Sequence, residues 1–287
     1  MKGILRAVDI IEHKDEIEIT KIQDFSPPLI FECGQCFRWD VIPDGSYVGI
    51  AKGKAARVNK KNGSVFISGT IDDFNLLWRD YFDLDRDYAQ IRSRVAIDEF
   101  MQNATDYGTG IRILRQDRWE ALCSFIISQC NNIKRIKGII SRFCELYGHP
   151  INFLGKTMYT FPTVETVASL NADDLAPIRS GYRAPYIISA AKRIESGQAD
   201  LDYISTLSEP EMLRELKQFD GVGNKVANCV MLFGFHRLDS FPIDVWIKRT
   251  VGEIYGKNFD PSVFGQYAGV AQQYMFHYAR TGGAVNV

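Results

Sequence analysis

The spacing of apolar residues along the chain changes at about residue 70. Before that point, short stretches such as EIEIT and SVFIS alternate apolar with polar residues, as expected for β-strands with one buried face. The segments ARVNK and SVFIS meet across Lys61-Asn62-Gly63, and an Asn-Gly pair between two such runs is a strong hairpin signal. The pattern predicts an antiparallel sheet at the beginning of the chain.

From Ile71 onward the apolar residues recur at intervals of three and four, as on one face of a helix. FNLLWRDYF and DYAQIRSRVAIDEFM show this pattern, and Asp117 is placed to begin a further helix. PTVETVASL and NADDLAPI are expected to form two short helices, and residues 149–160 a loop. The prediction is an α+β fold: an N-terminal antiparallel β-sheet domain with trailing helices (1–100) packed on a mainly α-helical domain (101–287).

Composition places the chain among ordinary globular proteins. Of its 287 residues, 46% are hydrophobic and 24% charged, and no apolar run reaches the roughly 18 residues of a membrane span. The first twenty residues lack the apolar core of a signal peptide, so we expect an intracellular protein with no membrane partner. Net charge is −1, but residues 1–110 hold 14 Lys+Arg against 18 Asp+Glu and residues 111–287 hold 20 against 17. Any anion-binding surface must therefore be a local patch in the second part.

The six cysteines do not indicate a metal or a disulfide framework. Cys33 and Cys36 form one Cys-x-x-Cys pair without a second pair at zinc spacing, and no cysteine follows Cys229. We expect no metal and no cofactor.

The stretch 219–250, FDGVGNKVANCVMLFGFHRLDSFPIDVWIKRT, concentrates the chemically informative residues. A helix begins before it, because Ser208 and Glu211 have the spacing of a capping box. Gly221 and Gly223 then predict a hairpin between two helices (208–234), with both glycines supplying positive φ and the free N–H groups of the second helix forming an anion site. A plain helical turn is the alternative.

Lys225 and Asp244 make a catalytic site the favoured interpretation. A lysine at the start of a helix lies at the positive end of the helix dipole, which favours the neutral, nucleophilic amine. Asp244 precedes VWIKRTVGEIY and can cap that helix while one carboxylate oxygen faces a developing positive charge. Capping alone would also explain an aspartate at this position.

These motifs resemble those of a known family. Gly-Val-Gly-x-Lys-Val-Ala followed by Pro-Ile-Asp-Val looks like the lysine-bearing branch of the helix-hairpin-helix DNA glycosylases, and CGQCFRW (33–39) resembles the SGQSFRW segment of the 8-oxoguanine DNA glycosylases. The resemblance covers residues 24–280. It implies a monomeric base-excision repair enzyme acting on double-stranded DNA that contains 8-oxoguanine opposite cytosine, located at the nucleoid if the source is prokaryotic. Lys225 would attack C1′, and β-elimination of the abasic site would follow.

The resemblance also implies a base pocket, formed by Gly34, Cys229, Gln272 and Phe276. A fixed glycine carbonyl accepts a hydrogen bond from N7–H of 8-oxoguanine and repels the N7 lone pair of guanine. Gln272 would bond the Watson–Crick edge, with Phe276 and Cys229 on opposite faces of the base. Each residue also has a purely structural explanation, as a turn glycine or as helix packing.

A further set of residues matches the family's contacts to the opposite base and to the DNA backbone. These are Cys130, Asn131, Arg135, Tyr182, Arg183, Gly221, Gly223 and Trp246. The resemblance makes the two arginines readers of the opposite cytosine and Tyr182 a wedge in the stack. Without the resemblance, Arg135 would be part of a solvated basic helix face and Tyr182 an ordinary aromatic at a helix start.

The chain departs from the family pattern at two of these positions. Cys130 replaces the first of three asparagines, which fills the space left by the flipped base, so the strictness of the opposite-base preference is in question. Trp246 stands where the animal enzymes commonly have histidine.

Two rival interpretations remain, and a third, the iron–sulfur enzymes, is disfavoured. The iron–sulfur branches of the superfamily place four cysteines after the catalytic aspartate, which this chain lacks. A monofunctional alkyl-purine glycosylase would have no lysine at position 225. In a non-catalytic helix-hairpin-helix module, Lys225 would only contact phosphate.

Overall fold

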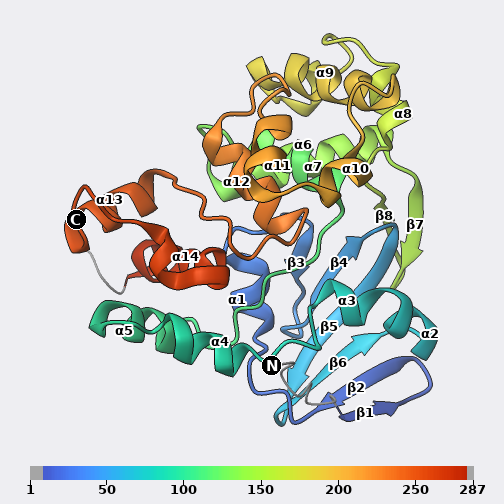
Figure 1. Ribbon diagram of the computed structural model, residues 1–287. Helices are drawn as coiled ribbons and strands as arrows, with labels where there is room; N and C mark the ends of the chain where they lie inside the picture. Colours follow the sequence, from blue (N-terminus) through green and yellow to red (C-terminus); the bar gives the residue numbers. More distant parts are fainter. Residues whose placement is uncertain (1–8, 283–287) are drawn as a thin grey trace.

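The computed structural model describes residues 9–282, so the outermost residues of both predicted domains lie outside the described part. The N-terminal part is a six-stranded antiparallel sheet in the order β1-β2-β6-β5-β4-β3 (Figure 1). The strands are β1 (Asp9–Glu12), β2 (Glu16–Thr20), β3 (Trp39–Val41), β4 (Tyr47–Ala51), β5 (Lys54–Lys61) and β6 (Ser64–Ser68). Asn62 and Gly63 both have positive φ in the β5–β6 turn, so the predicted two-residue hairpin is confirmed.

An aromatic cluster forms the core beneath this sheet. The helix α1 (Pro27–Glu32) between β2 and β3 contributes Phe31, whose ring stacks on Trp39 at a centroid distance of 4.3 Å. The segment after β6 contributes Trp78 and Phe82, and both side chains are buried. It consists of α2 (Ile71–Asp73), the π-helical turn η1 (Phe74–Trp78) and α3 (Arg79–Tyr81), with Phe82 as the C-cap of α3.

The rest of the chain is mainly helical, which confirms the predicted α+β fold. Its first elements are α4 (Tyr88–Val95), α5 (Glu99–Tyr107), α6 (Arg118–Ile127), α7 (Ile133–Tyr147), α8 (Val164–Ala168), η2 (Ala176–Ile178), η3 (Gly181–Arg183) and α9 (Ala184–Glu195). Then follow α10 (Leu201–Thr206), α11 (Glu209–Leu216), α12 (Asn224–Phe233), α13 (Val245–Ile254), η4 (Pro261–Tyr267) and α14 (Ala268–Thr281). Figure 1 shows α6 to α12 as one group above the sheet and α4, α5, α13 and α14 as a second group beside α1.

Two local expectations were wrong. The segment 149–160 is a β-hairpin, β7 (Pro150–Phe153) paired with β8 (Lys156–Tyr159), rather than a loop. Leu154 and Gly155 both have positive φ, and this turn geometry closes antiparallel strands as an Asn-Gly pair does. The second of the two short helices, η2, is a single 3₁₀ turn.

The apolar residues form two cores, and these cores bear on the domain boundary. One core is formed mostly by residues of the sheet and of the helices next to it between Ile17 and Leu84, whereas Tyr88, Ile91 and Met101 from α4 and α5 belong to the core of the helical part. We propose that α4 and α5, expected to trail the sheet domain within 1–100, belong with the helical domain. Between residues 9 and 282, no helix is long and apolar enough to cross a membrane.

Candidate active site

The predicted helix-hairpin-helix consists of α11, a glycine hairpin and α12. Ser208 and Glu211 form the predicted capping box at the start of α11. Gly221 has φ +75°, and a Cβ at this position would stand 2.4 Å from Cδ2 of Tyr186. Only glycine fits there, because the backbone is left-handed and the tyrosine ring occupies the space of a side chain.

The expectation that Gly223 also has positive φ was wrong. Gly223 is the N-cap of α12 with φ −90° and ψ −176°, since an N-cap residue adopts extended backbone angles. It is exposed, and a Cβ there would meet no atom within 4 Å. The first turn of α12 is therefore open to an approaching anion, as the hairpin motif requires.

Lys225 lies in the first turn of α12 and reaches the end of α6. Its Nζ donates to Ser128 Oγ at 3.3 Å and lies 5.6 Å from the centroid of the Phe125 ring. Ser128 Oγ donates its own hydrogen to the carbonyl of Phe125 at 2.8 Å. Because this hydrogen is used in the bond to the Phe125 carbonyl, the hydroxyl presents a lone pair to the lysine and holds the amine at a fixed place.

Asp244 and Cys229 share an electrostatic environment with Lys225. Asp244 is the N-cap of α13, and its Oδ1 accepts from the Ile247 N–H at 2.8 Å, so the predicted cap is confirmed. Burial raises the pKa of Asp244, and the nearby Lys225 opposes that rise. Burial likewise raises the pKa of the Cys229 thiol, with Lys225 lowering it and Asp244 raising it. The fold thus brings the amine, the carboxylate and the thiol close enough for their charges to interact.

Gly34, Phe276 and Gln272 form a second group between the two parts of the fold. Gly34 has φ +86°, and a Cβ built on it would lie 3.4 Å from Cε1 of Phe276. Gln272, one turn before Phe276 on α14, is 5% exposed, and its Oε1 is buried without a hydrogen-bond partner. A buried acceptor without a partner is costly, which makes Gln272 a candidate for binding a donor on a ligand.

Cys130, Arg135 and Tyr182 are exposed residues in the region between α6 and α9. Cys130 has φ +46°, in the region where asparagine is enriched among non-glycine residues. Partial desolvation raises the pKa of Tyr182, and the neighbouring Cys130 thiol adds to the rise. Asn131 is half-buried, with its amide bonded to the Ile127 carbonyl at 3.2 Å.

Arg183 differs from Arg135 in its surroundings. It is 3% exposed, and its guanidinium donates to the carbonyls of Gln129, Cys130 and Ser180. These bonds hold the turn that carries Cys130 in its left-handed conformation. Arg183 is therefore buried and supports this surface through its hydrogen bonds, whereas Arg135 is exposed on it.

Trp246 and its neighbours form an exposed apolar rim at the start of α13. Ile243 is 51% exposed, Val245 82% and Trp246 39%. This rim flanks Asp244 on both sides in the sequence. Exposed apolar surface therefore lies beside the Asp244 carboxylate at the start of α13.

Sequence reasoning did not identify Ser128, Gln273 or Gln35 as site residues. Gln273 follows Gln272 directly in the sequence, and its Nε2 donates to the Cys33 carbonyl at 2.8 Å. Ser128 had no signal beyond its place in SFIISQ. The Gln35 side chain is completely buried, and only the resemblance of its CGQC segment drew attention to its neighbour Gly34.

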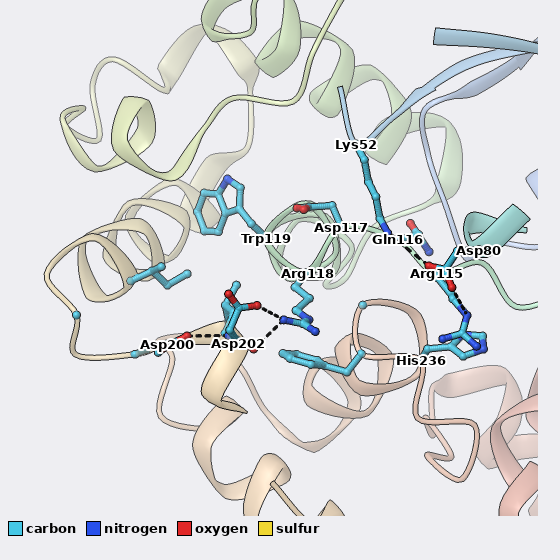
Figure 2. Close-up of a pocket in the computed structure, with 16 residues that line it drawn as sticks. Lys52, Asp80, Arg115, Gln116, Asp117, Arg118, Trp119, Asp200, Asp202 and His236 are labelled. Atoms are coloured by element: carbon cyan, nitrogen blue, oxygen red, sulfur yellow. Dashed lines mark hydrogen bonds and ion pairs between the residues drawn. The ribbon is translucent and has the colours of Figure 1, made fainter. Parts of the chain in front are cut away.

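A cleft of about 730 Å³ lies at the opposite end of α12 from Lys225 (Figure 2). The helix separates the two ends by about 13 Å. The lysine and arginine side chains of the cleft each pair with a carboxylate: Arg118 with Asp202, and Arg115 and Lys52 with Asp80. Because these basic side chains are already paired and none of the predicted site residues lines the cleft, we do not assign the reaction to it.

Comparison with known proteins identifies domains and relatives. Residues 17–122 match the model of the 8-oxoguanine DNA glycosylase N-terminal domain, and residues 123–263 match the HhH-GPD superfamily base excision DNA repair protein. A probable N-glycosylase/DNA lyase of Methanothermobacter thermautotrophicus is 31% identical over 66% of this chain and 70% of its own length.

Two solved structures are similar over nearly their whole length. The structure of MBOgg1 in complex with a low-affinity DNA ligand has 40% identity and a TM-score of 0.92, covering 96% of this chain and 99% of that one. The 8-oxoguanine glycosylase/lyase of Clostridium acetobutylicum, in complex with double-stranded DNA containing cytosine opposite 8-oxoguanine, has 38% identity, the same TM-score and the same coverage. The chain belongs to the 8-oxoguanine DNA glycosylase/lyases of the helix-hairpin-helix base-excision repair superfamily.

Proposed function

We propose that this enzyme excises 8-oxoguanine opposite cytosine from duplex DNA with Lys225 as its nucleophile and Asp244 as its electrostatic partner. The observation that carries the proposal is the convergence of the Lys225 amine, the Asp244 carboxylate and the Cys229 thiol at the end of the glycine hairpin. An enzyme with this substrate acts at the chromosome, which is the nucleoid in a prokaryote.

Recognition of the flipped base requires groups that match its hydrogen-bonding pattern. The carbonyl of the half-buried Gly34 accepts from N7–H, which guanine lacks. The partnerless Oε1 of Gln272 accepts from the N1–H or amino group on the Watson–Crick edge. Phe276 supplies an aromatic face, and Arg280 lies over that ring at 5.3 Å from its centroid.

The chemical steps follow from the amine and the carboxylate. The neutral Lys225 nitrogen forms a bond to C1′ while the C1′–N9 bond breaks, and the base leaves with the electron pair and takes up a proton. Asp244 stabilises the positive charge that develops on the sugar. The C1′–O4′ bond then breaks as the nitrogen lone pair forms the C=N bond, and O4′ takes up a proton, which leaves a protonated Schiff base. Removal of a C2′ proton then expels the 3′ phosphate, which cuts the strand.

The opposite strand meets the exposed residues of the α6–α9 surface. The Arg135 guanidinium can donate to the O2 and N3 acceptors of cytosine, whereas adenine presents a repelling amino group. Tyr182 is 54% exposed and can act as a wedge that replaces lost stacking. Arg183 holds the Cys130 turn beneath them, and Asn131 extends the same contact region.

The presence of Lys225 argues against a monofunctional alkyl-purine glycosylase, and the buried partnerless Gln272 argues against a module that binds only phosphates. The test is cleavage of duplexes with 8-oxoguanine opposite each of the four bases, by the unmodified enzyme and by Lys225→Gln. We expect strand cleavage with a preference for cytosine, and none by the variant. Cleavage by Lys225→Gln at the unmodified rate would overturn the assignment.

A further inference from the structure

A buried glutamine from the last helix holds the backbone immediately before Gly34. Gln273 is 2% exposed, and its Nε2 donates to the carbonyl of Cys33 at 2.8 Å. The two residues are 240 positions apart in sequence, so this bond ties α14 to the end of α1 (Figure 1). A buried amide is tolerated only when it is hydrogen-bonded, and here the bond goes to the peptide that precedes the reading position.

The backbone after Gly34 is held in a comparable way. The Gln35 side chain donates to the carbonyls of Ile30 and Arg112 at 2.9 and 2.8 Å and accepts from the Leu114 N–H at 2.9 Å. The carbonyl of Gln35 in turn accepts from Gln116 Nε2 at 2.7 Å. Both neighbours of Gly34 are therefore fixed by buried bonds to distant segments.

Gly34 itself has no such bond at its carbonyl. Within residues 9–282 nothing donates to that oxygen, and the residue has φ +86°. Glycine adopts positive and negative φ with about equal ease, so the direction of this carbonyl depends on how firmly the neighbouring peptides are held. A carbonyl that must accept from N7–H and repel a lone pair needs a fixed direction.

We propose that Gln273 is a positioning residue that sets the specificity for the oxidised purine, by holding the Gly34 carbonyl in register with Gln272 and Phe276. The side chains of Gln272, Gln273 and Phe276 all come from α14. The hydrogen bond from Gln273 therefore fixes the Gly34 carbonyl relative to the two side chains that contact the edge and the face of the base. The two adjacent glutamines thus have different roles. Gln272 has a free acceptor for the ligand, and Gln273 donates to the protein backbone. The inference rests on the proposed role of Gly34 as reader of the lesion.

The test is Gln273→Met, which keeps side-chain length and removes the hydrogen bond. Misplacing a reacting or reading group by about 1 Å costs up to about 100-fold in rate. We expect the single-turnover excision of 8-oxoguanine opposite cytosine to fall about 10- to 100-fold. Cleavage of a preformed abasic site should stay within about twofold, because that substrate has no base to read.

A second substrate isolates the N7–H contact. In 7-deaza-8-oxoguanine a carbon replaces N7, so the Gly34 carbonyl has no N–H to accept from. Gln273→Met should weaken binding of the 8-oxoguanine duplex at least about tenfold and binding of the deaza duplex less than about threefold.

Thr105→Val is the matched control. Thr105 is 1% exposed on α5, which packs on α14, and its Oγ1 donates to the Gln102 carbonyl at 3.0 Å. This variant loses one buried bond without touching the Cys33–Gln35 segment, so we expect unchanged ratios between substrates. If Gln273→Met slows excision and abasic-site cleavage in equal proportion, Gln273 only supports the fold and the inference is overturned. If the unmodified enzyme leaves the 8-oxoguanine duplex intact, the proposed function itself fails.

Discussion

Asp244 performs two tasks that two substitutions can separate. Its Oδ1 caps α13 through the Ile247 N–H at 2.8 Å, and its negative charge is proposed to stabilise the sugar cation. The substitution Asp244→Asn would keep the capping oxygen, since asparagine and aspartate cap equally well, but would remove the charge. We expect it to lower the single-turnover excision rate by about 10²–10³-fold, or about 3–4 kcal/mol in activation free energy.

A second variant, Asp244→Ala, removes the cap as well as the charge, so the free energies of unfolding of the two variants should differ. Because burial raises the pKa of Asp244, ionising this carboxyl costs folding free energy, and the cost appears as pH rises through the raised pKa. Asp244→Asn should therefore be at least as stable as the unmodified protein at neutral pH. Asp244→Ala loses the cap and should lower the free energy of unfolding by about 1 kcal/mol, or about 2–4 °C in Tm.

The assay combines single-turnover excision on an 8-oxoguanine·cytosine duplex with thermal unfolding of the same preparations. Excision by the unmodified enzyme should also decline as pH falls through the raised pKa of Asp244, because protonation removes the charge, and Asp244→Asn should lack this limb. The electrostatic role is refuted if Asp244→Asn excises within about threefold of the unmodified rate. The separation of the two tasks is refuted if the asparagine variant loses as much stability as the alanine variant.

The surroundings of the site give three further predictions. Gly221→Ala should lower the free energy of unfolding in chemical denaturation by about 2–4 kcal/mol, because the backbone is left-handed there and a tyrosine ring lies against it. Gly223→Ala should lower it by less than about 1 kcal/mol. Equal losses in the two variants would contradict this prediction. Ser128→Ala should slow single-turnover excision about tenfold without weakening DNA binding in titrations, because it removes the acceptor for Lys225 Nζ. Ser128→Thr keeps a hydroxyl, so an equally slow threonine variant would contradict the role of the hydroxyl. Cys130→Asn should stabilise the protein by up to about 1 kcal/mol in thermal unfolding, since asparagine tolerates φ +46°. The same variant should raise the ratio of excision opposite cytosine to excision opposite adenine. An unchanged ratio would argue that position 130 does not contact the opposite strand.

The parts of the fold that local chemistry determines could be predicted from the sequence. The Asn62-Gly63 turn, the Ser208–Glu211 capping box and the Asp244 cap each depend on a few adjacent residues, and the structure has them as expected. The hairpin at 149–160 was missed because its turn is formed by Leu154 and Gly155, and leucine is not a typical residue at positive φ.

The site could be predicted only where a motif carries its residues. Lys225 and Asp244 lie in one such motif, and the structure places them in a shared electrostatic environment. The contact of Gln273 with Cys33 could not be found, because it joins residues 240 positions apart and neighbouring glutamines look alike in sequence. Gly223 was assigned positive φ because glycine is commonly used for it, but the N-cap position requires extended backbone.

The nucleophilic role of Lys225 is tested most directly by borohydride reduction during reaction with an 8-oxoguanine·cytosine duplex, followed by peptide mapping of the covalent protein–DNA adduct. Reduction converts a Schiff base into a stable amine, so the adduct marks the attacking nitrogen. We predict one adduct, on the peptide that contains Lys225, and none with Lys225→Gln. An adduct on another lysine, or equal trapping of the variant, would contradict the mechanism.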